Sequence, residues 1–98
     1  VDDNIAAMHL YHIAQEAIQN AIKHGQPQRV EVALESDGDV VLSIRDDGQG
    51  FPAEGPSQHG SGMRIMRFRA NLIGADLQVA SNPGEGVTVT CRAPRKSM

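Results

Sequence analysis

The residues best suited to chemistry fall into three short groups. In the first, Glu16 and Asn20 lie four residues apart in a segment with helical spacing, and Lys23 and His24 follow directly. Residues at this spacing share one side of a helix, so Glu16, Asn20 and Lys23 are expected to project opposite an apolar stripe. The amide of Asn20 suits Mg²⁺, the carboxylate of Glu16 can polarise an attacking group, and Lys23 can meet a phosphate as a point charge. A solvated polar face is the simpler explanation for each residue taken singly.

The second group reads Asp-Asp-Gly-Gln-Gly-Phe from Asp46 onward. Strand alternation places Asp46 on the same, buried face as Ile44. A buried carboxylate is costly unless hydrogen-bond donors meet it, so Asp46 is either a strand-end residue in solvent or a residue whose donor comes from a ligand's amino group. Asp47 is expected to face solvent or to contact a ligand through water. Gly48 and Gly50 would let a flat ring approach the backbone closely.

The third group, Gly60-Ser61-Gly62-Met63, opens a segment with helical spacing. The free N–H groups and the positive dipole end of a helix favour anions. An ordinary glycine-rich helix start with Ser61 as its cap explains the same residues. Taken together, the three groups offer a metal ligand, a base reader and a phosphate cradle, which is what a purine nucleoside triphosphate site requires.

Composition argues against several other classes. A net charge of −3 gives no general attraction to nucleic acid, and one Tyr, two Phe and no Trp are too few for a base-stacking platform. Cys91, the single cysteine, is expected to be a small buried hydrophobe. The chain has no Walker-type loop, no zinc spacing among its four histidines, and no nucleophile elbow.

The elements that must position these groups follow from periodicity. Residues 5–24 and 61–73 have helical spacing, whereas Val30, Val32 and Leu34 alternate on one face of a first strand. Two prolines and two glycines predict a loop over residues 51–60. The order is helix, two strands, helix, two strands, which predicts one domain with both helices on one face of a sheet. The predicted strands cover residues 29–35, 40–46, 77–79 and 87–92.

These groups, in this order, resemble the catalytic ATP-binding domain of sensor histidine kinases, and in particular its nitrate-sensor-like branch. The motifs that carry this resemblance are Gln-Glu-Ala-x-x-Asn-Ala-x-x-His over 15–24, Asp-Asp-Gly-x-Gly-Phe over 46–51 and Gly-x-Gly over 60–62. The superfamily also holds gyrase, a heat-shock chaperone and mismatch-repair ATPases. The resemblance spans about Leu10 to Pro94 and implies a Bergerat-type α+β fold. That fold is a two-layer α/β sandwich with helices on one face of a mixed, mostly antiparallel sheet.

The resemblance also implies a role for each group. Asn20 would ligate the Mg²⁺ bound to the phosphates of ATP, and Glu16 would act as the catalytic residue near the γ-phosphate or the attacking imidazole. Asp46 would accept from the adenine amino group, and residues 51–60 would form a lid. The other positions expected to contact ATP are Lys23, His24, Gly48, Gly50, Gly60, Ser61, Gly62 and Met63.

The implied activity is that of an ATP-dependent protein histidine kinase. The γ-phosphoryl group would pass to a histidine on the dimerisation domain of the same parent protein, and a response regulator would act downstream. Residues 1–98 are expected to be one domain of a longer cytoplasmic or membrane-anchored protein, because the chain starts at Val1 and lacks a phosphoacceptor pattern. The fragment itself is expected to touch neither membrane nor nucleic acid, and to be inactive alone in autophosphorylation.

Two alternatives stay open: an anti-sigma-type protein serine kinase, and a nucleotide-binding interaction module without transfer activity. The details Gln15-Glu16-Ala17 and Arg69-Ala70 favour the histidine kinase.

Overall fold

A computed structural model describes residues 3–49, 61–82 and 84–94 of this chain. Its elements follow the predicted order of helix, two strands, helix, two strands. They are α1 (Asp3–Asn20) with a π-helical continuation η1 (Ala21–Gly25), β1 (Val30–Asp37), β2 (Asp39–Asp46), α2 (Ser61–Leu72), β3 (Asp76–Asn82) and β4 (Gly86–Ala93).

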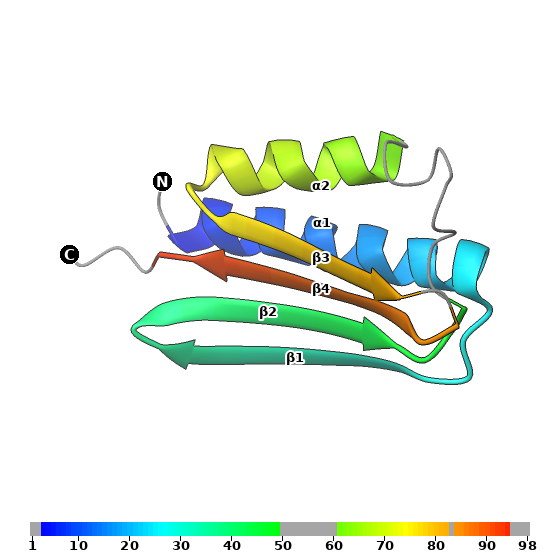
Figure 1. Ribbon diagram of the computed structural model, residues 1–98. Coiled ribbons are helices and arrows are strands. Elements are labelled where there is room, and N and C mark those ends of the chain that lie inside the picture. The colour runs from blue at the N-terminus through cyan, green and yellow to red at the C-terminus, as the bar shows by residue number, and fades with distance from the viewer. Residues whose placement is uncertain (1–2, 50–60, 83, 95–98) are drawn as a thin grey trace.

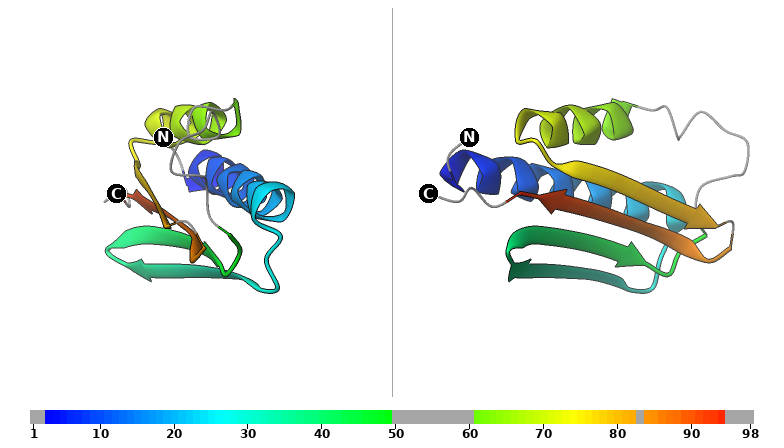
Figure 2. Two further views of the ribbon diagram at one scale, coloured as in Figure 1. Left: turned by 45° about the vertical axis from the view of Figure 1, so that its right-hand side comes forward. Right: turned by 60° about the vertical axis from the view of Figure 1, so that its left-hand side comes forward.

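The strands form one four-stranded sheet in the order β1-β2-β4-β3. Every pairing among the described strands is antiparallel, so the sheet contains no parallel pair over these residues. Both helices lie side by side on one face of it (Figure 1), and the two turned views in Figure 2 show the same two layers. The predicted two-layer α+β sandwich is therefore confirmed.

The core lies between the helices and the two central strands. The sheet contributes a row across three strands, in which Leu42 pairs with Cys91 and Cys91 with Leu77. The helices contribute residues at the predicted helical spacing, among them Ile13 of α1 and Met66 of α2, which are 0% and 1% exposed. Alternation in strands and 3.6-residue spacing in helices thus bring apolar side chains to one interface.

Cys91 sits at the centre of this core and is fully buried. Burial, and to a lesser degree the negative charge of Asp76, raises the pKa of its thiol to about 11. The prediction that Cys91 acts as a small buried hydrophobe is confirmed.

A polar contact joins the two helices at the edge of the core. His9 of α1 is buried, and its Nδ1 accepts from the Nη1 of Arg69 in α2 at 3.0 Å. Because a guanidinium can only donate, this bond requires Nδ1 to be unprotonated.

The alternation predicted for β1 is present, but its apolar face is not covered. Val32 and Leu34 are 50% and 65% exposed. β1 is an edge strand, and α1 packs over β2 and β4 instead.

The ends of the helices agree with the sequence in one case and differ in the other. α2 ends in a Schellman motif, in which Gly74 has φ 66° and the N–H of Ala75 donates to the oxygen of Ala70 at 2.8 Å. The first helix was expected to run as one α-helix to residue 24. Instead it widens into a π-helix from Ala21 to Gly25, and Gln26 then adopts a left-handed conformation with φ 47°. The tertiary hydrogen bond that holds Gly25, described below, gives a physical reason for this difference.

Candidate functional site

The predicted site residues gather at one end of the molecule. The end of α1 with η1, the end of β2 and the start of α2 all lie at the right-hand side of Figure 1, and the views in Figure 2 agree. The end of the helix that carries Glu16 and Asn20 and the end of the strand that carries Asp46 therefore lie at the same end of the molecule. The topology causes the meeting, because β2 runs in the direction that returns its end to the end of the first helix.

Asp46 is the last residue of β2, and it is 7% exposed. It shares the inward face with Leu42 and Ile44, as the alternation predicted. Its Oδ1 accepts from the backbone N–H of Gly48 at 2.8 Å. The interpretation as a solvated strand-end residue is therefore wrong, and a buried carboxylate lies at this end of the core.

Three glycines pack directly around Asp46, namely Gly25, Gly48 and Gly86. A Cβ on Gly48 would lie 2.5 Å from the backbone oxygen of Gly25 and 3.0 Å from Oδ1 of Asp46. A Cβ on Gly86 would collide with the backbone carbonyl of Asp46, and would lie 3.2 Å from Oδ1. Real Cβ atoms do not come this close, so Gly48 and Gly86 must be glycine for the backbones to meet here.

Sequence reasoning missed two of these glycines as site residues. It used Gly25 only as a helix stop and Gly86 only as part of a turn. The signal that could have pointed to them is their position: Gly25 directly follows the polar residues of the first helix, and Gly86 opens β4, the strand that pairs with β2.

The residues of the first group differ in how exposed they are. Glu16 and Asn20 are half-buried on α1, whereas Lys23 is exposed on η1. Because Lys23 and His24 lie in a π-helical turn, the angle expected for an unbroken α-helix does not apply to them.

Asp47 does more than the sequence suggested. Its residue is exposed, as expected, but its Oδ1 accepts from the backbone N–H groups of Gln28 and Arg29, both at 2.9 Å. The expectation of a solvent-facing or water-mediated residue is therefore incomplete, because the side chain bonds directly to the segment before β1.

Gly50 of the second group, Gly60 of the third group and the expected lid over 51–60 lie outside the described residues. Ser61 and Gly62 form the start of α2. Met63 is 5% exposed and belongs to the core beneath the start of that helix.

A metal ion at this site would need ligands from elsewhere as well. Within the described ranges, no group of three or more His, Cys, Asp or Glu side chains could hold an ion. Asn20 and Glu16 offer one amide and one carboxylate. That donor set fits Mg²⁺, which keeps several waters and shares phosphate oxygens.

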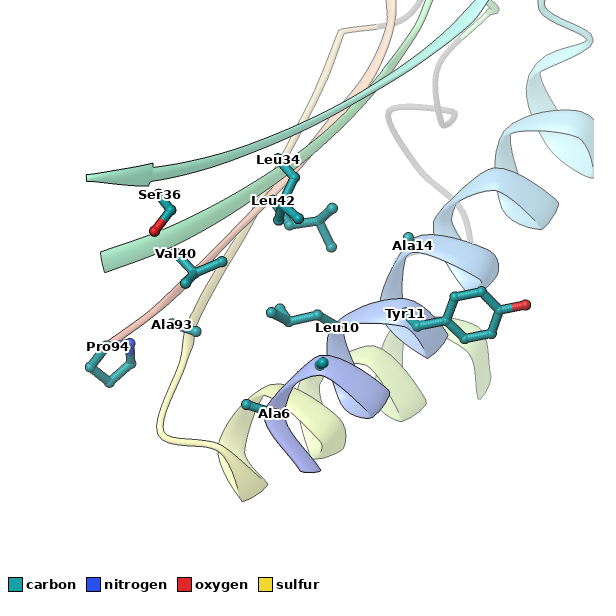
Figure 3. Close-up of a pocket in the computed structure, with 11 residues that line it drawn as sticks. Ala6, Leu10, Tyr11, Ala14, Leu34, Ser36, Val40, Leu42, Ala93 and Pro94 are labelled. Atoms are coloured by element: carbon teal, nitrogen blue, oxygen red, sulfur yellow. The ribbon is translucent and has the colours of Figure 1, made fainter. Parts of the chain in front are cut away.

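An apolar groove of about 460 Å³ lies at the opposite end of the sheet and is not this site. Figure 3 shows Leu10 reaching from α1 towards the strands, with Leu34, Val40 and Leu42 on the other wall. The groove contains none of the predicted site residues, and it offers no carboxylate or amide side chain to recognise a base.

Comparison with known proteins identifies the family of this chain. The sequence model of the histidine kinase-, DNA gyrase B- and HSP90-like ATPase family matches residues 5–97. The chain belongs to this family. The predicted resemblance to the ATP-binding domain of sensor histidine kinases is thereby confirmed, as is its superfamily.

Individual members of the histidine kinase-like ATPase family support the assignment. Sensor protein VraS of Staphylococcus aureus is 37% identical over 87 residues, which cover 88% of this chain and 25% of VraS. The chain therefore spans about a quarter of the length of the curated relatives that it matches.

Solved structures of family members share the fold. The histidine kinase domain of the blue-light activated kinase of Erythrobacter litoralis EL346 has a TM-score of 0.78 and 26% identity, covering 92% of this chain and 48% of that one. The ATP-binding domain of PrrB from Mycobacterium tuberculosis has a TM-score of 0.77 and 28% identity, covering 92% of this chain and 69% of that one. Over the described residues, neither helix has the length and apolar content to cross a bilayer.

Proposed function

We propose that this chain binds Mg·ATP and transfers its γ-phosphoryl group to a histidine on the dimerisation domain of its parent sensor kinase. The observation that carries the proposal is the buried carboxylate of Asp46, set among three glycines at the same end of the fold as Glu16 and Asn20. Membership of the histidine kinase-like ATPase family supports ATP as the nucleotide.

In this proposal, Asp46 reads the base. One of its oxygens is occupied by the N–H of Gly48, and the carboxylate accepts a hydrogen bond from the adenine amino group. Guanine presents a carbonyl oxygen at the same position, and two acceptors cannot pair. A site with an unpaired buried polar group loses about 1–3 kcal/mol, so adenine is preferred.

The phosphates lie toward the first helix and the start of α2. Lys23 contacts a phosphate as an exposed cation, and the N–H groups at the start of α2 favour the same negative charge. Asn20 would hold the Mg²⁺, which when bound neutralises phosphate charge. His24, Gly50, Gly60, Ser61 and Gly62 keep the ATP-contacting roles that the resemblance implies.

In the transfer itself, an imidazole nitrogen of the acceptor histidine forms a bond to the γ-phosphorus. The bond from that phosphorus to the β,γ-bridging oxygen breaks, and ADP leaves with the electron pair. Glu16 lies one helical turn before Asn20 and orients the attacking imidazole, taking up its proton. Catalysis then rests mainly on positioning and charge neutralisation.

The partners are the histidine-bearing dimerisation domain of the parent and a downstream response regulator. The proposed location is the cytoplasm, with the parent either free there or anchored to the membrane.

The test compares ATP and GTP by calorimetry. We expect the wild-type chain to prefer ATP by about tenfold or more, from the cost of the unpaired acceptor. Asp46→Asn keeps an oxygen for Gly48 and adds an amino donor that can pair with guanine, so the preference should shrink. Asp39→Asn, an acid at the opposite end of β2, is the matched control and should leave the preference unchanged. Equal wild-type affinities for ATP and GTP would contradict the role of Asp46.

The acceptor is tested in the full-length parent. Formation of acid-labile phosphate in the presence of ATP would support the histidine kinase, provided that Glu16→Ala lowers the amount formed. Acid-stable phosphate on a serine would point to the anti-sigma-type kinase, and binding without any transfer would point to an interaction module.

A further inference from the structure

We propose that Asp47 is a positioning residue for the nucleotide site. It fixes the end of the first helix, on the phosphate side of the site, relative to the carboxylate of Asp46, on the base side. The inference rests on the proposed function, because it assigns these two sides to one nucleotide. Asp47 acts through the backbone and need not touch the ligand.

The contacts of Asp47 join two segments that are far apart in the sequence. Its Oδ1 accepts from Gln28 N and Arg29 N, both at 2.9 Å, and its own N–H donates to the oxygen of Arg29 at 3.3 Å. Gln28 and Arg29 precede β1, whereas Asp47 follows β2. One oxygen atom of Asp47 therefore accepts hydrogen bonds from both N–H groups.

A second set of contacts holds the other end of the same connection. The N–H of Gln49 donates to the oxygen of Gly25 at 3.0 Å, and a Cβ on Gly25 would lie 3.6 Å from Cα of Gly48. Residues 46–49 thus contact the end of η1 directly, and Asp47 contacts the residues just beyond it.

The connection between these two points is short and conformationally restricted. It consists of Gln26, which has φ 47°, and Pro27, whose ring fixes its φ and which has no N–H. A left-handed non-glycine residue is uncommon and needs its surroundings to hold it. Asp47 supplies that restraint on the C-terminal side, and so it helps keep the π-helical turn that carries Lys23 and His24 in place.

The consequence for binding is specific. Asp46 is held by β2 and by Gly48, so the base side should survive the loss of Asp47. The phosphate side depends on where η1 ends, and it should be displaced. Removal of Asp47 should therefore weaken ATP more than adenosine, which has no phosphates.

Three variants separate the position of the acceptor from its charge. Asp47→Ala removes the acceptor, Asp47→Asn keeps an acceptor oxygen at the same place without charge, and Asp47→Glu keeps the charge but moves the acceptor one methylene outward. We expect Asp47→Ala to weaken ATP about tenfold, from the loss of two hydrogen bonds, and adenosine by less than about twofold. Asp47→Asn should stay within about twofold of wild type for both ligands, and Asp47→Glu should show the selective loss in smaller measure. If Asp47→Ala does not fold, the comparison of Asp47→Glu with Asp47→Asn carries the test.

Equal loss of ATP and adenosine affinity in the folded variants would overturn the proposal, because it would indicate general destabilisation. Loss in Asp47→Asn as large as in Asp47→Ala would also overturn it, because charge rather than acceptor position would then matter.

Amide hydrogen exchange provides a separate test of the restraint that needs no nucleotide. The N–H groups of residues 21–25, 28 and 29 should exchange faster in Asp47→Ala than in Asp47→Asn, whereas those of α1 up to Asn20 should not change. Unchanged exchange at these residues would overturn the restraint. If the wild-type chain bound no ATP while this exchange pattern held, the proposed function would fail and the restraint on η1 would stand.

Discussion

The backbones of three glycines pack closely around Asp46, and this makes its neighbourhood sensitive to single added atoms. Gly86 offers a direct test of this sensitivity, because a Cβ there would collide with the backbone carbonyl of Asp46. We expect Gly86→Ala to lower the free energy of unfolding by about 1–3 kcal/mol more than Gly38→Ala does, measured by urea denaturation. Gly38 is the matched control because it has φ +82° against φ +92° for Gly86, but has no atom near its Cβ position. Equal losses in the two variants would show that conformation alone, and not the contact with Asp46, requires glycine.

At Asn20, the prediction concerns the metal. Asn20→Ala should weaken ATP binding strongly when Mg²⁺ is present and only slightly when it is absent, because the lost amide oxygen is proposed to bind the ion rather than the nucleotide. Calorimetry in both conditions measures the difference. Gln19→Ala, the exposed neighbouring amide, is the control and should bind like wild type. Equal losses with and without Mg²⁺ would contradict the ligand role.

At the scale of elements, β4 carries a thiol whose titration reports on the core. The raised pKa of Cys91, about 11 against an ordinary 9.0, means that the fold favours the neutral thiol. Its contribution to stability is complete below about pH 9 and is lost as the pH rises through about 11, by at most roughly 1.4 kcal/mol per pH unit. The free energy of unfolding should therefore fall more steeply over this range in wild type than in Cys91→Ala. Parallel curves for the two proteins would contradict a buried neutral thiol, as would rapid reaction of the native thiol with an alkylating reagent near neutral pH.

The elements themselves were largely predictable, because their signals are local. Alternation in residues 40–46 located β2 and the inward face of Asp46, and Gly74 marked the end of α2. The π-helical turn was not predictable, since Gly25 is held by Gln49, a residue distant in sequence. The bonds of Asp47 to Gln28 and Arg29 escaped prediction for the same reason. The exposure of Leu34 depends on which element covers β1, and no periodicity in the sequence contains that information.

At the scale of the whole molecule, the proposed division of labour predicts that this chain alone does not phosphorylate itself. His9 is buried and bonded to Arg69, and the ring of His12 packs edge-on against Tyr11, with 5.4 Å between ring centroids. Both histidines are fixed on α1, the helix that also carries Glu16 and Asn20, so neither can readily approach the γ-phosphate in line. Phosphate should appear only when the dimerisation domain of the parent is added, in cis or in trans. Mass spectrometry that found stoichiometric acid-labile phosphate on a histidine of the isolated chain would contradict this account.

The uncovered face of β1 affects how readily the isolated protein aggregates during storage. Among the described strands, the two edges of the sheet differ: β3 exposes Asp76 and Gln78, whereas β1 exposes Val32 and Leu34. An apolar edge strand invites pairing with a strand of another molecule, and Glu31 and Glu35 provide the charges that oppose it. Slow aggregation of the isolated chain during concentrated storage should therefore begin at β1, and should accelerate when Glu31 and Glu35 are both replaced by Gln.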